Sequence, residues 1–508
     1  MNGTRRATRP RCPRQPILEH HHVPATCVPS PPEKDVPAVN KSRQSPATLT
    51  PPGSPPPGTG ELLVDSPGVL RPLLRLALPV LVEQLLNFLV VISDTALAGR
   101  YLQQQHVAAM TMVAYVMWLI PVLFATVGIG ATALIARFYG ARDFRMATRV
   151  ANQAMLLGLG FCAGIFVVFW FWTEPLLRLL RLDEATIPLV DRYLEFILPI
   201  LPAVMLLQVG PACLRGAGDT VSGMVAMGVV NAVNIVASWG LVLGWFGPAW
   251  GWDGLALGTA IGHVIGAMII LVLLLRGRMG LHLRLQQMRP DAHLIRRLLH
   301  VGVPGGMDML AIVACHLWYL AIINSLGAVV TAAHGVAVRI ESLSYLPGSA
   351  FQVAAGTLAG QYLGAGQPQR AKRSAVVACL VGGGIMVAAG VIFYVFAEPL
   401  VRLLVSADKV AEINTAYPLL KIVAFATAPL ALTMILSGAL RGAGDTRWPF
   451  AIGMAGMLGV RIPLAHLAVY HYHLGVQGAW WAMVIDLWVR CLLVAWRFGQ
   501  GGWQKIKV

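Results

Sequence analysis

Long apolar stretches follow one another from about Pro72 to near the end of the chain, separated by short polar or mixed breaks. A helix of roughly 20 apolar residues, rising 1.5 Å per residue, crosses the roughly 30 Å hydrocarbon core of a bilayer. The pattern therefore predicts an all-α membrane protein with about twelve transmembrane helices. The expected spans centre near Asn87, Phe124, Phe161, Met205, Val236, Val264, Ile312, Tyr345, Met386, Ala428, Gly459 and Leu487.

The chain also contains an internal duplication. Leu214–Thr220 reads Leu-Arg-Gly-Ala-Gly-Asp-Thr and recurs letter for letter at Leu440–Thr446, and Glu174-Pro175-Leu176 returns as Glu398-Pro399-Leu400 at nearly the same separation. This separation is far longer than the roughly 20–50 residues of a solenoid repeat. It suits two homologous lobes of six helices each. Because six is even, both lobes enter the membrane from the same side, as parallel repeats do.

These patterns divide the chain into five predicted segments: a disordered, basic and Pro-rich tail over 1–65, an N-lobe over 66–280, a basic cytoplasmic linker over 281–298, a C-lobe over 299–500 and a cytoplasmic C-terminal tail over 501–508. The N-terminal tail has no apolar core and is not a secretory signal. An organelle transit peptide is a weaker interpretation, because Glu19, Glu33 and Asp35 interrupt the basic residues.

Composition agrees with a bilayer location. Of the 508 residues, 56% are hydrophobic and 12% are charged, and the mean hydropathy is +0.67. Soluble proteins have about 25% charged residues. The net charge of +16 is not interpreted as a nucleic-acid footprint, because no basic stretch is interleaved with aromatic residues on a soluble domain.

Basic residues set the expected orientation, because Lys and Arg are enriched in cytoplasmic loops. They gather after the second, sixth and eighth spans: Arg137, Arg142, Arg145 and Arg149; Arg276, Arg278, Arg284, Arg289, Arg296 and Arg297; Arg370, Lys372 and Arg373. The opposite breaks are mixed or aromatic, such as Glu174 to Arg192 and Trp245 to Trp252. We therefore expect a multi-pass protein of a plasma membrane, a bacterial inner membrane, with both termini cytoplasmic.

The first span has the densest set of polar residues. Glu83, Asn87 and Asp94 share one stripe of the helix. Either this stripe is hydrogen-bonded for packing, or it lines a water-accessible cavity in which Asp94 takes up a cation or a proton. The fifth and sixth spans add Asn231, Asn234, Ser238, Thr259 and His263. Their neutral oxygen atoms beside a carboxylate suit a hard monovalent cation or a proton-relay water, although amides and hydroxyls also hold helices together.

The second half differs in its charged residues. Asp308 occupies the position of Glu83, whereas no carboxylate corresponds to Asp94. Asp308 and Glu341 are candidates to bind a cationic substrate, and Asp486 with Arg490 or Arg461 is interpreted as a structural ion pair. The repeated Leu-Arg-Gly-Ala-Gly-Asp-Thr motif is interpreted as a hairpin between spans, in which the glycines permit a tight turn and Asp219 or Asp445 caps the next helix.

Seven cysteines are scattered without the spacing of a disulfide framework or a zinc site. Tyr470-His471-Tyr472-His473 is the one tight cluster of metal-ligand type in an expected loop, and it lacks acidic partners. A membrane-embedded transferase would need clustered Asp, His or Cys at a membrane face. We therefore expect neither an enzyme nor a resident metal or cofactor.

Residues 70 to 500 resemble the multidrug and toxic compound extrusion (MATE) family of secondary transporters. The resemblance rests on the twin hairpin motifs, on Pro79 followed by Ile92-Ser93-Asp94-Thr95 and Gly99, and on Thr357–Gly366. It implies twelve helices in two lobes around a central cavity and an exchange of organic cations for Na⁺ or H⁺. It also implies that Asp94, Asn234 and Thr259 form the cation site of the N-lobe. Ser238 departs from members with a second aspartate there, and Ile312 stands roughly where another branch has a glutamate.

The sequence thus predicts a monomeric antiporter that exports small organic cations by rocker-switch alternating access in exchange for H⁺ or Na⁺. Coupling is expected at Asp94, Asn234, Thr259 and Ser238, and the substrate cavity at Glu83, Asn87, Asp308 and Glu341. The main alternative is a flippase of the same wider superfamily for a lipid-linked substrate. Such a protein would more often line its cavity with several arginines, whereas the basic residues of this chain lie mostly in expected loops.

Overall fold

Long α-helices make up almost all of the computed structural model, and no strand occurs among the residues that it describes. The described residues are 62–102, 104–179 and 186–506, and all of them belong to the compact unit Pro51–Val508. Most of the predicted tail, residues 1–61, lies outside them, as do the last two residues of the predicted C-terminal tail.

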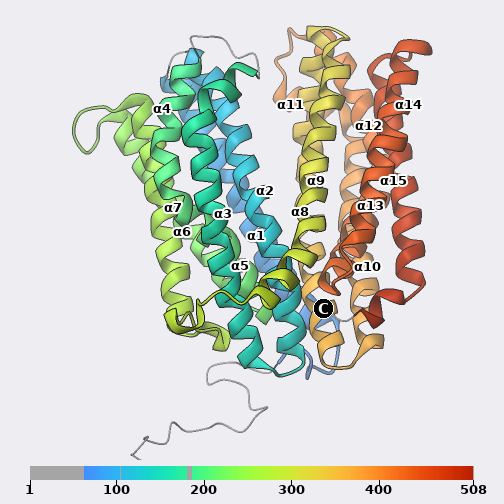
Figure 1. Ribbon diagram of the computed structural model, residues 1–508. Helices are drawn as coiled ribbons and strands as arrows, with labels where there is room; N and C mark the ends of the chain where they lie inside the picture. Colours follow the sequence, from blue (N-terminus) through green and yellow to red (C-terminus); the bar gives the residue numbers. More distant parts are fainter. Residues whose placement is uncertain (1–61, 103, 180–185, 507–508) are drawn as a thin grey trace, which may run out of the picture. The chain divides into compact units, whose positions relative to one another are not determined.

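The first half of the chain forms the N-lobe (Figure 1). Its elements are α1 (Leu70–Tyr101), α2 (Gln104–Gly140), α3 (Phe144–Leu179), α4 (Ile187–Ile197), η1 (Leu198–Ile200), α5 (Leu201–Ala217), α6 (Val221–Leu243) and α7 (Gly251–Leu275). α4, η1 and α5 follow one another without a break and together make one span over Ile187–Ala217. Arg192 therefore lies inside a helix and not in the break that the sequence predicted over Glu174 to Arg192.

The second half forms the C-lobe. The linker contains η2 (Arg278–Gly280) and η3 (Leu285–Gln287); the lobe itself contains α8 (Ala292–Asn324), α9 (Ala328–Gly364), α10 (Pro368–Val395), α11 (Ala397–Leu404), α12 (Val410–Gly442), α13 (Arg447–Gly456), η4 (Met457–Arg461), α14 (Ile462–His466), η5 (Leu467–His471) and α15 (Gly475–Gly499), and η6 (Gly502–Lys505) follows it. α8 begins at Ala292, so the linker ends before the predicted boundary at 298. The elements η4 and η5 are π-helical turns within one span over Arg447–His471.

Eleven helical segments among the described residues are long and apolar enough to cross a membrane. The remaining long helix, α9, spans 37 residues and carries polar side chains such as Arg339, Glu341 and Gln352 along its length. Every predicted span centre falls inside one of these segments or inside α9. The predicted all-α membrane fold is confirmed.

The repeated motif forms a hairpin in both lobes. Gly218 and Gly444 follow the ends of α5 and α12 with φ of 96° and 91°, a left-handed conformation that glycine adopts without strain. Asp219 accepts a hydrogen bond from the Ser222 amide (3.0 Å), which confirms the predicted cap. Burial raises the pKa of Asp219, but hydrogen bonds from Arg278 and Ser222 outweigh burial and hold the pKa below its usual value. Asp445 instead forms an ion pair with Arg497 (2.7 Å).

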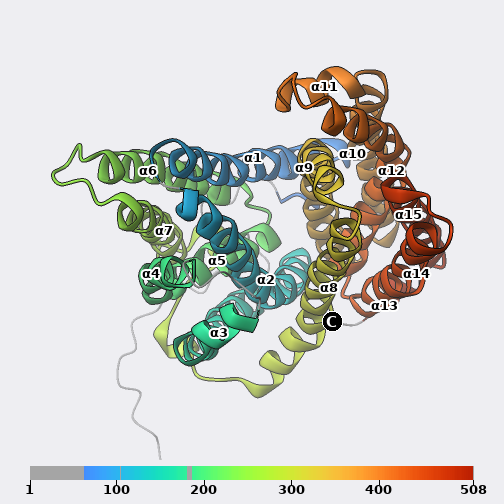
Figure 2. The ribbon, with the colours of Figure 1, turned by 90° about the horizontal axis from the view of Figure 1, so that it is seen from above.

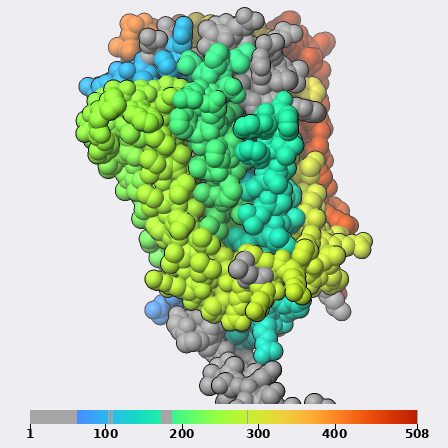
Figure 3. Space-filling model, turned by 60° about the vertical axis from the view of Figure 1, so that its left-hand side comes forward, coloured from blue at the N-terminus to red at the C-terminus, as the bar shows by residue number. Residues whose placement is uncertain are grey.

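The linker is fixed to the N-lobe. It crosses that lobe beside α3 before it reaches α8 (Figure 3). The Asn152 side chain donates to the His282 carbonyl (2.8 Å) and accepts from the Arg284 amide (2.9 Å). The Gln153 side chain donates to the Arg289 carbonyl (2.8 Å). Buried side-chain amides of α3 thus bind the backbone of a segment that has little regular structure of its own.

The two lobes meet through helices that correspond in the duplication. α2 packs along α8 and α9, and α1 packs along α9 (Figure 2). Close contact occurs at glycines: a Cβ atom at Gly140 of α2 would lie 2.0 Å from the Gln361 carbonyl oxygen, and one at Gly364 of α9 would lie 2.1 Å from the Arg137 carbonyl oxygen. These reciprocal contacts lie close to the basic breaks around Arg142 and Arg370. We call this end of the bundle the basic end.

Both described ends of the chain pack at the basic end. Leu62, Leu63 and Val64 are buried, and Arg370 of α10 donates to the carbonyl oxygens of Val64 (2.7 Å) and Ser66. The predicted tail boundary at 65 therefore falls within a packed segment. At the other end of the chain, Trp503 is buried, and Arg137 of the N-lobe donates to the Ile506 carbonyl (2.8 Å).

Candidate functional site

A stripe of glycines on α7 brings the candidate coupling residues together. Gly254, Gly258, Gly262 and Gly266 repeat every four residues and lie on the face of α7 that meets α6. A Cβ atom at Gly258 would lie 2.3 Å from Ser238 Oγ, so the two helices approach with no space for a side chain. Thr259, the next residue, is thereby held against Asn234 of α6.

Asp94 of α1 completes a polar cluster with these two helices. The Asn234 amide nitrogen donates to Thr259 Oγ1 (3.1 Å), and Ser238 Oγ lies 3.4 Å from the same nitrogen. Thr259 Oγ1 lies 3.2 Å from Asp94 Oδ2 and 3.1 Å from the Leu255 carbonyl oxygen, so its single proton goes to one of the two. Asp94 and Thr259 are 3% exposed and Asn234 and Ser238 are 0% exposed. The structure therefore brings all four predicted coupling residues together.

The cluster has unused oxygen atoms. Asp94 Oδ1 and Asn234 Oδ1 are buried and have no hydrogen-bond partner within the described part of the chain. None of the described Lys or Arg side chains forms an ion pair with Asp94. A buried carboxylate of this kind needs a compensating cation or a proton. Among the described residues, no group of three or more His, Cys, Asp or Glu side chains could hold a metal ion.

Tyr193 is a member of the cluster that the sequence analysis missed. It lies on α4, it is buried, and its hydroxyl lies 3.3 Å from Thr259 Oγ1. The predicted break over Glu174 to Arg192 ends one residue before Tyr193, and Tyr193 was not among the predicted site residues. Apolar residues recur at helical spacing on α4, at Val190, Tyr193, Leu194 and Ile197. This periodicity could have predicted that Tyr193 lies on the buried face of a helix.

Asn231 and His263 lie near these residues without joining the cluster. The Asn231 amide donates to the Met227 carbonyl of its own helix (2.9 Å), and His263 Nδ1 lies 2.8 Å from the Thr259 carbonyl oxygen. Asn87 similarly donates to the Glu83 carbonyl (2.9 Å). These contacts favour the packing interpretation for Asn87, Asn231 and His263.

Two of the four predicted substrate-cavity residues are paired with the repeated motif. Glu83 accepts from Arg215 (3.2 Å), and Asp308 forms an ion pair with Arg441. The two pairs correspond in the duplication, since each joins the first helix of a lobe to the arginine that ends its fourth span. Arg215 and Arg441 also line a cavity of about 160 Å³ between the lobes. The sequence aligned Glu83 with Asp308 but did not pair them with these arginines.

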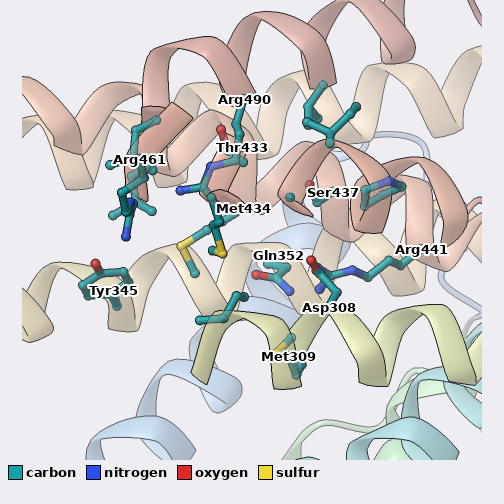
Figure 4. Close-up of a pocket in the computed structure, with 18 of the residues that line it drawn as sticks. Asp308, Met309, Tyr345, Gln352, Thr433, Met434, Ser437, Arg441, Arg461 and Arg490 are labelled. Atoms are coloured by element: carbon teal, nitrogen blue, oxygen red, sulfur yellow. The ribbon is translucent and has the colours of Figure 1, made fainter. Parts of the chain in front are cut away.

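The C-lobe contains a cavity of about 230 Å³ (Figure 4). Asp308 lines it together with Arg441, Arg461 and Arg490. Asp486 is fully buried and accepts from both Arg461 (2.9 Å) and Arg490 (2.8 Å), which confirms the predicted ion pair. Glu341 is buried and accepts from the Tyr345 hydroxyl (3.0 Å). Although most basic residues were expected in loops, Arg441, Arg461 and Arg490 thus line a cavity inside the C-lobe.

Two homologous bundles of membrane-crossing helices, with a buried polar cluster in one lobe and a charged cavity in the other, define a membrane transporter of the two-lobe type. The family model MatE matches residues 79–239 and 304–467, once in each lobe. The chain belongs to the multidrug and toxic compound extrusion family.

Individual relatives match over nearly their whole length. A "Probable multidrug resistance protein NorM" of Thermotoga maritima is 29% identical over 448 residues, which are 87% of this chain and 94% of the relative. Among solved structures, an outward-facing multidrug resistance MATE family transporter has a TM-score of 0.82 at 20% identity and covers 88% of this chain and 98% of its own. A transporter of the MOP superfamily from Pyrococcus furiosus, described as having a binding pocket of reverse polarity, has a TM-score of 0.82 at 20% identity, with 88% and 99% covered.

Proposed function

We propose that the protein exports organic cations in exchange for protons, and that Asp94 is the coupling carboxylate. The observation that carries the proposal is the buried Asp94 side chain, whose contacts in the described residues are neutral and whose Oδ1 is unpartnered. A charge in such a place needs a counter-ion in every state of the cycle. The name of the Thermotoga relative, a probable multidrug resistance protein, agrees with export of drugs.

A proton fits the cluster better than Na⁺ does. The site offers one negative charge, from Asp94. Residue 238, where some family members have a second aspartate, is a serine. One proton neutralises that charge completely. A dehydrated Na⁺ would need several further oxygen ligands, and here they would come from the neutral side chains of Asn234, Ser238 and Thr259. Na⁺ remains the competing coupling ion.

Coupling follows from competition between the proton and the cationic substrate. Protonation of Asp94 from outside removes the charge that attracts the cation, which is then released. Loss of the proton to the cytoplasm restores the charge. For the lobes to rock between two states, the proton must bind one state more tightly than the other.

The experiment is cation efflux from proteoliposomes under two separate gradients. We expect efflux under ΔpH alone and none in the Asp94→Asn variant, because the amide keeps the volume but cannot change its charge. Asp94→Glu should retain part of the activity. Efflux driven by a Na⁺ gradient with ΔpH collapsed, and absent under ΔpH alone, would overturn proton coupling. Wild-type exchange in Asp94→Asn at equal expression would overturn the role of Asp94.

We also propose that the protein acts as a monomer in a bacterial inner membrane with its basic end and both termini in the cytoplasm. The support is the excess of Lys and Arg at that end. A cysteine at the exposed position of Arg284 should react with an impermeant thiol reagent in inverted vesicles. Reaction in intact cells would contradict this orientation.

A flippase for lipid-linked substrates is the second candidate function. It is favoured by one observation, the three arginines that line the C-lobe cavity. The transporter from Pyrococcus furiosus, whose binding pocket is described as having reverse polarity, shows that the same fold occurs with a different pocket charge. Binding of lipid phosphates without any binding of organic cations would favour this function over export of cations.

A further inference from the structure

The charges that face the C-lobe cavity are mainly positive. Three guanidinium groups and one carboxylate line it, from Arg441, Arg461, Arg490 and Asp308. Asp308 and Arg441 form an ion pair with each other at one side of the cavity (Figure 4). Because Asp308 neutralises Arg441, the remaining positive charge in the lining comes from Arg461 and Arg490.

Arg461 and Arg490 share one carboxylate. Arg461 Nε and Arg490 Nη2 both donate to the same oxygen of Asp486, Oδ2. The side chain of Asp486 is 0% exposed and does not line the cavity, whereas both arginines do. Arg490 Nε is buried and has no hydrogen-bond partner among the described residues. Two buried guanidinium groups thus share one hydrogen-bonded carboxylate, so one of the two positive charges has no directly bonded anion of its own, which favours binding of a further anion.

Glu341 is the other carboxylate in reach of this group. It attracts Arg461 electrostatically, but it accepts its hydrogen bond from the Tyr345 hydroxyl, and it does not line the cavity. Glu341 therefore weakens the excess positive charge without occupying the place where a ligand would bind. Its removal should strengthen the attraction of the cavity for an anion, whereas removal of Arg461 should weaken it.

The rest of the lining suits an amphipathic molecule. Gln352, Thr433 and Ser437 offer polar groups, and Met309, Ile312, Leu430 and Met434 offer an apolar and adaptable surface. Gln352 and Arg441 also line the cavity between the lobes, so the two cavities share part of their walls. The C-lobe cavity therefore adjoins the cavity between the lobes.

We propose that Arg461 and Arg490 form an anion subsite that binds the carboxylate of a zwitterionic amphipathic substrate. Guanidinium groups bind carboxylates through paired, charge-assisted hydrogen bonds. The inference rests on the proposed export of cations and deepens it: the substrate class carries an acidic group as well as a positive charge. A phosphate head group presents the same chemistry to the arginines, and the experiment below separates the two sources.

The test compares tetramethylrhodamine, a zwitterion, with its methyl ester, a cation that differs by the loss of the carboxylate charge. Binding to the purified full-length protein is measured by fluorescence polarisation. We expect the wild type to bind the zwitterion roughly tenfold more tightly than the ester, which corresponds to about 1.4 kcal/mol. Arg461→Gln should lose this preference and keep its affinity for the ester. It leaves the Arg490–Asp486 pair intact, and Arg461→Lys should retain part of the preference.

Two further variants make the prediction specific. Glu341→Gln should shift the affinity for the zwitterion in the opposite direction, toward tighter binding. Arg339→Gln is the matched control, because Arg339 is an exposed arginine of α9 that does not line the cavity. It should leave both affinities unchanged. A merely structural role of Arg461 would weaken both ligands equally and would not produce effects of opposite sign.

Equal binding of zwitterion and ester by the wild type, or equal loss of both in Arg461→Gln, would overturn the subsite. Displacement of the zwitterion by dodecyl phosphate at much lower concentration than by a matched carboxylate would replace the proposed source by a phosphate. Export of the ester under ΔpH tests the proposed function separately, because it does not require the subsite.

Discussion

The buried carboxylates of this protein differ in their partners, and the partners set their roles. Asp94 has neutral neighbours, whereas Asp308 and Asp486 each bind arginine. Glu83 lies on the same stripe of α1 as Asp94 and is nevertheless paired with Arg215. A carboxylate that already has a guanidinium partner is poorly suited to capture a cation. This difference in partners supports the proposed coupling at Asp94, whereas Glu83 and Asp308 are held in ion pairs.

The first prediction concerns the Glu83–Arg215 pair. Replacing Glu83 by Gln leaves a largely buried guanidinium without its counter-charge, and breaking a buried pair in this way costs about 3–5 kcal/mol. We expect a lower melting temperature for Glu83→Gln in detergent. The double variant Glu83→Gln with Arg215→Gln removes both charges and should recover a large part of the loss. A melting temperature equal to that of the wild type in the single variant would show that the pair is dispensable.

At the scale of residues, the sequence selected the polar residues that lie together around Asp94 and the ion pair at Asp486, but not the pairing of Glu83 and Asp308 with arginines. Asp94, Asn234 and Thr259 could be selected because polar groups inside apolar spans are costly and few. Tyr193 was missed because it directly follows the predicted break over Glu174 to Arg192, whereas it belongs to the span Ile187–Ala217. The pairing of Arg441 with Asp308 could not be predicted, because it depends on how α8 and α12 pack around a common cavity. Sequence position relative to a loop says little about where a long arginine side chain points.

At the scale of elements, spacing of small residues carries information that hydropathy does not. The glycines of α7 repeat every four residues and fix its approach to α6, which places Thr259 beside Asn234. In the C-lobe the eleventh span, Arg447–His471, corresponds to α6 and contains the π-helical turn Met457–Arg461, which ends at the subsite arginine. π-helical turns often occur at functional sites, since they redirect side chains within an otherwise regular helix. Hydropathy alone, which predicts the number of spans, could predict neither the close contact of α6 and α7 nor the π-helical turn.

The second prediction tests the contact between α6 and α7. In Gly258→Ala the added methyl group would lie 2.3 Å from Ser238 Oγ and 2.5 Å from its backbone nitrogen, so the helices must separate. Such overpacking costs typically about 1–3 kcal/mol. We expect weaker ΔpH-driven efflux and a lower melting temperature.

The matched control for this contact is Gly160→Ala in α3, where no atom lies within 4 Å of the added Cβ. It should be neutral. If Gly258→Ala transports at the wild-type rate, the close approach of the two helices does not position the cluster.

At the scale of the whole molecule, contacts between the lobes gather at the basic end. Gly140 and Gly364 approach the opposite lobe reciprocally, and Gln361 donates to the Gly216 carbonyl (2.9 Å). The segment Leu62–Ser66 bridges both lobes, because Asp65 pairs with Arg142 and Arg370 binds Val64 and Ser66. The structure therefore represents a state in which the basic end is closed, and any state with this end open must break these contacts.

The third prediction follows from this asymmetry. In Gly364→Ala the added methyl group would lie 2.1 Å from the Arg137 carbonyl oxygen and 3.0 Å from the Ala141 nitrogen, two backbone atoms of the opposite lobe. The substitution penalises the closed basic end and leaves other states untouched, so it shifts the equilibrium toward an open basic end. A cost of about 1.4 kcal/mol changes the ratio of the two states roughly tenfold.

The readout is a cysteine at Gln208, which lines the cavity between the lobes, in an otherwise cysteine-free protein. In inverted vesicles an impermeant thiol reagent should label this cysteine faster in Gly364→Ala than in the parent. Gly384→Ala provides the control, because no atom lies within 4 Å of its added Cβ. If labelling rates are equal while Gly364→Ala keeps its melting temperature, the reciprocal glycines do not close the basic end. Faster labelling together with slower ΔpH-driven efflux would place this contact directly in the transport cycle, because a transporter that rocks between two states turns over more slowly when one of them is disfavoured.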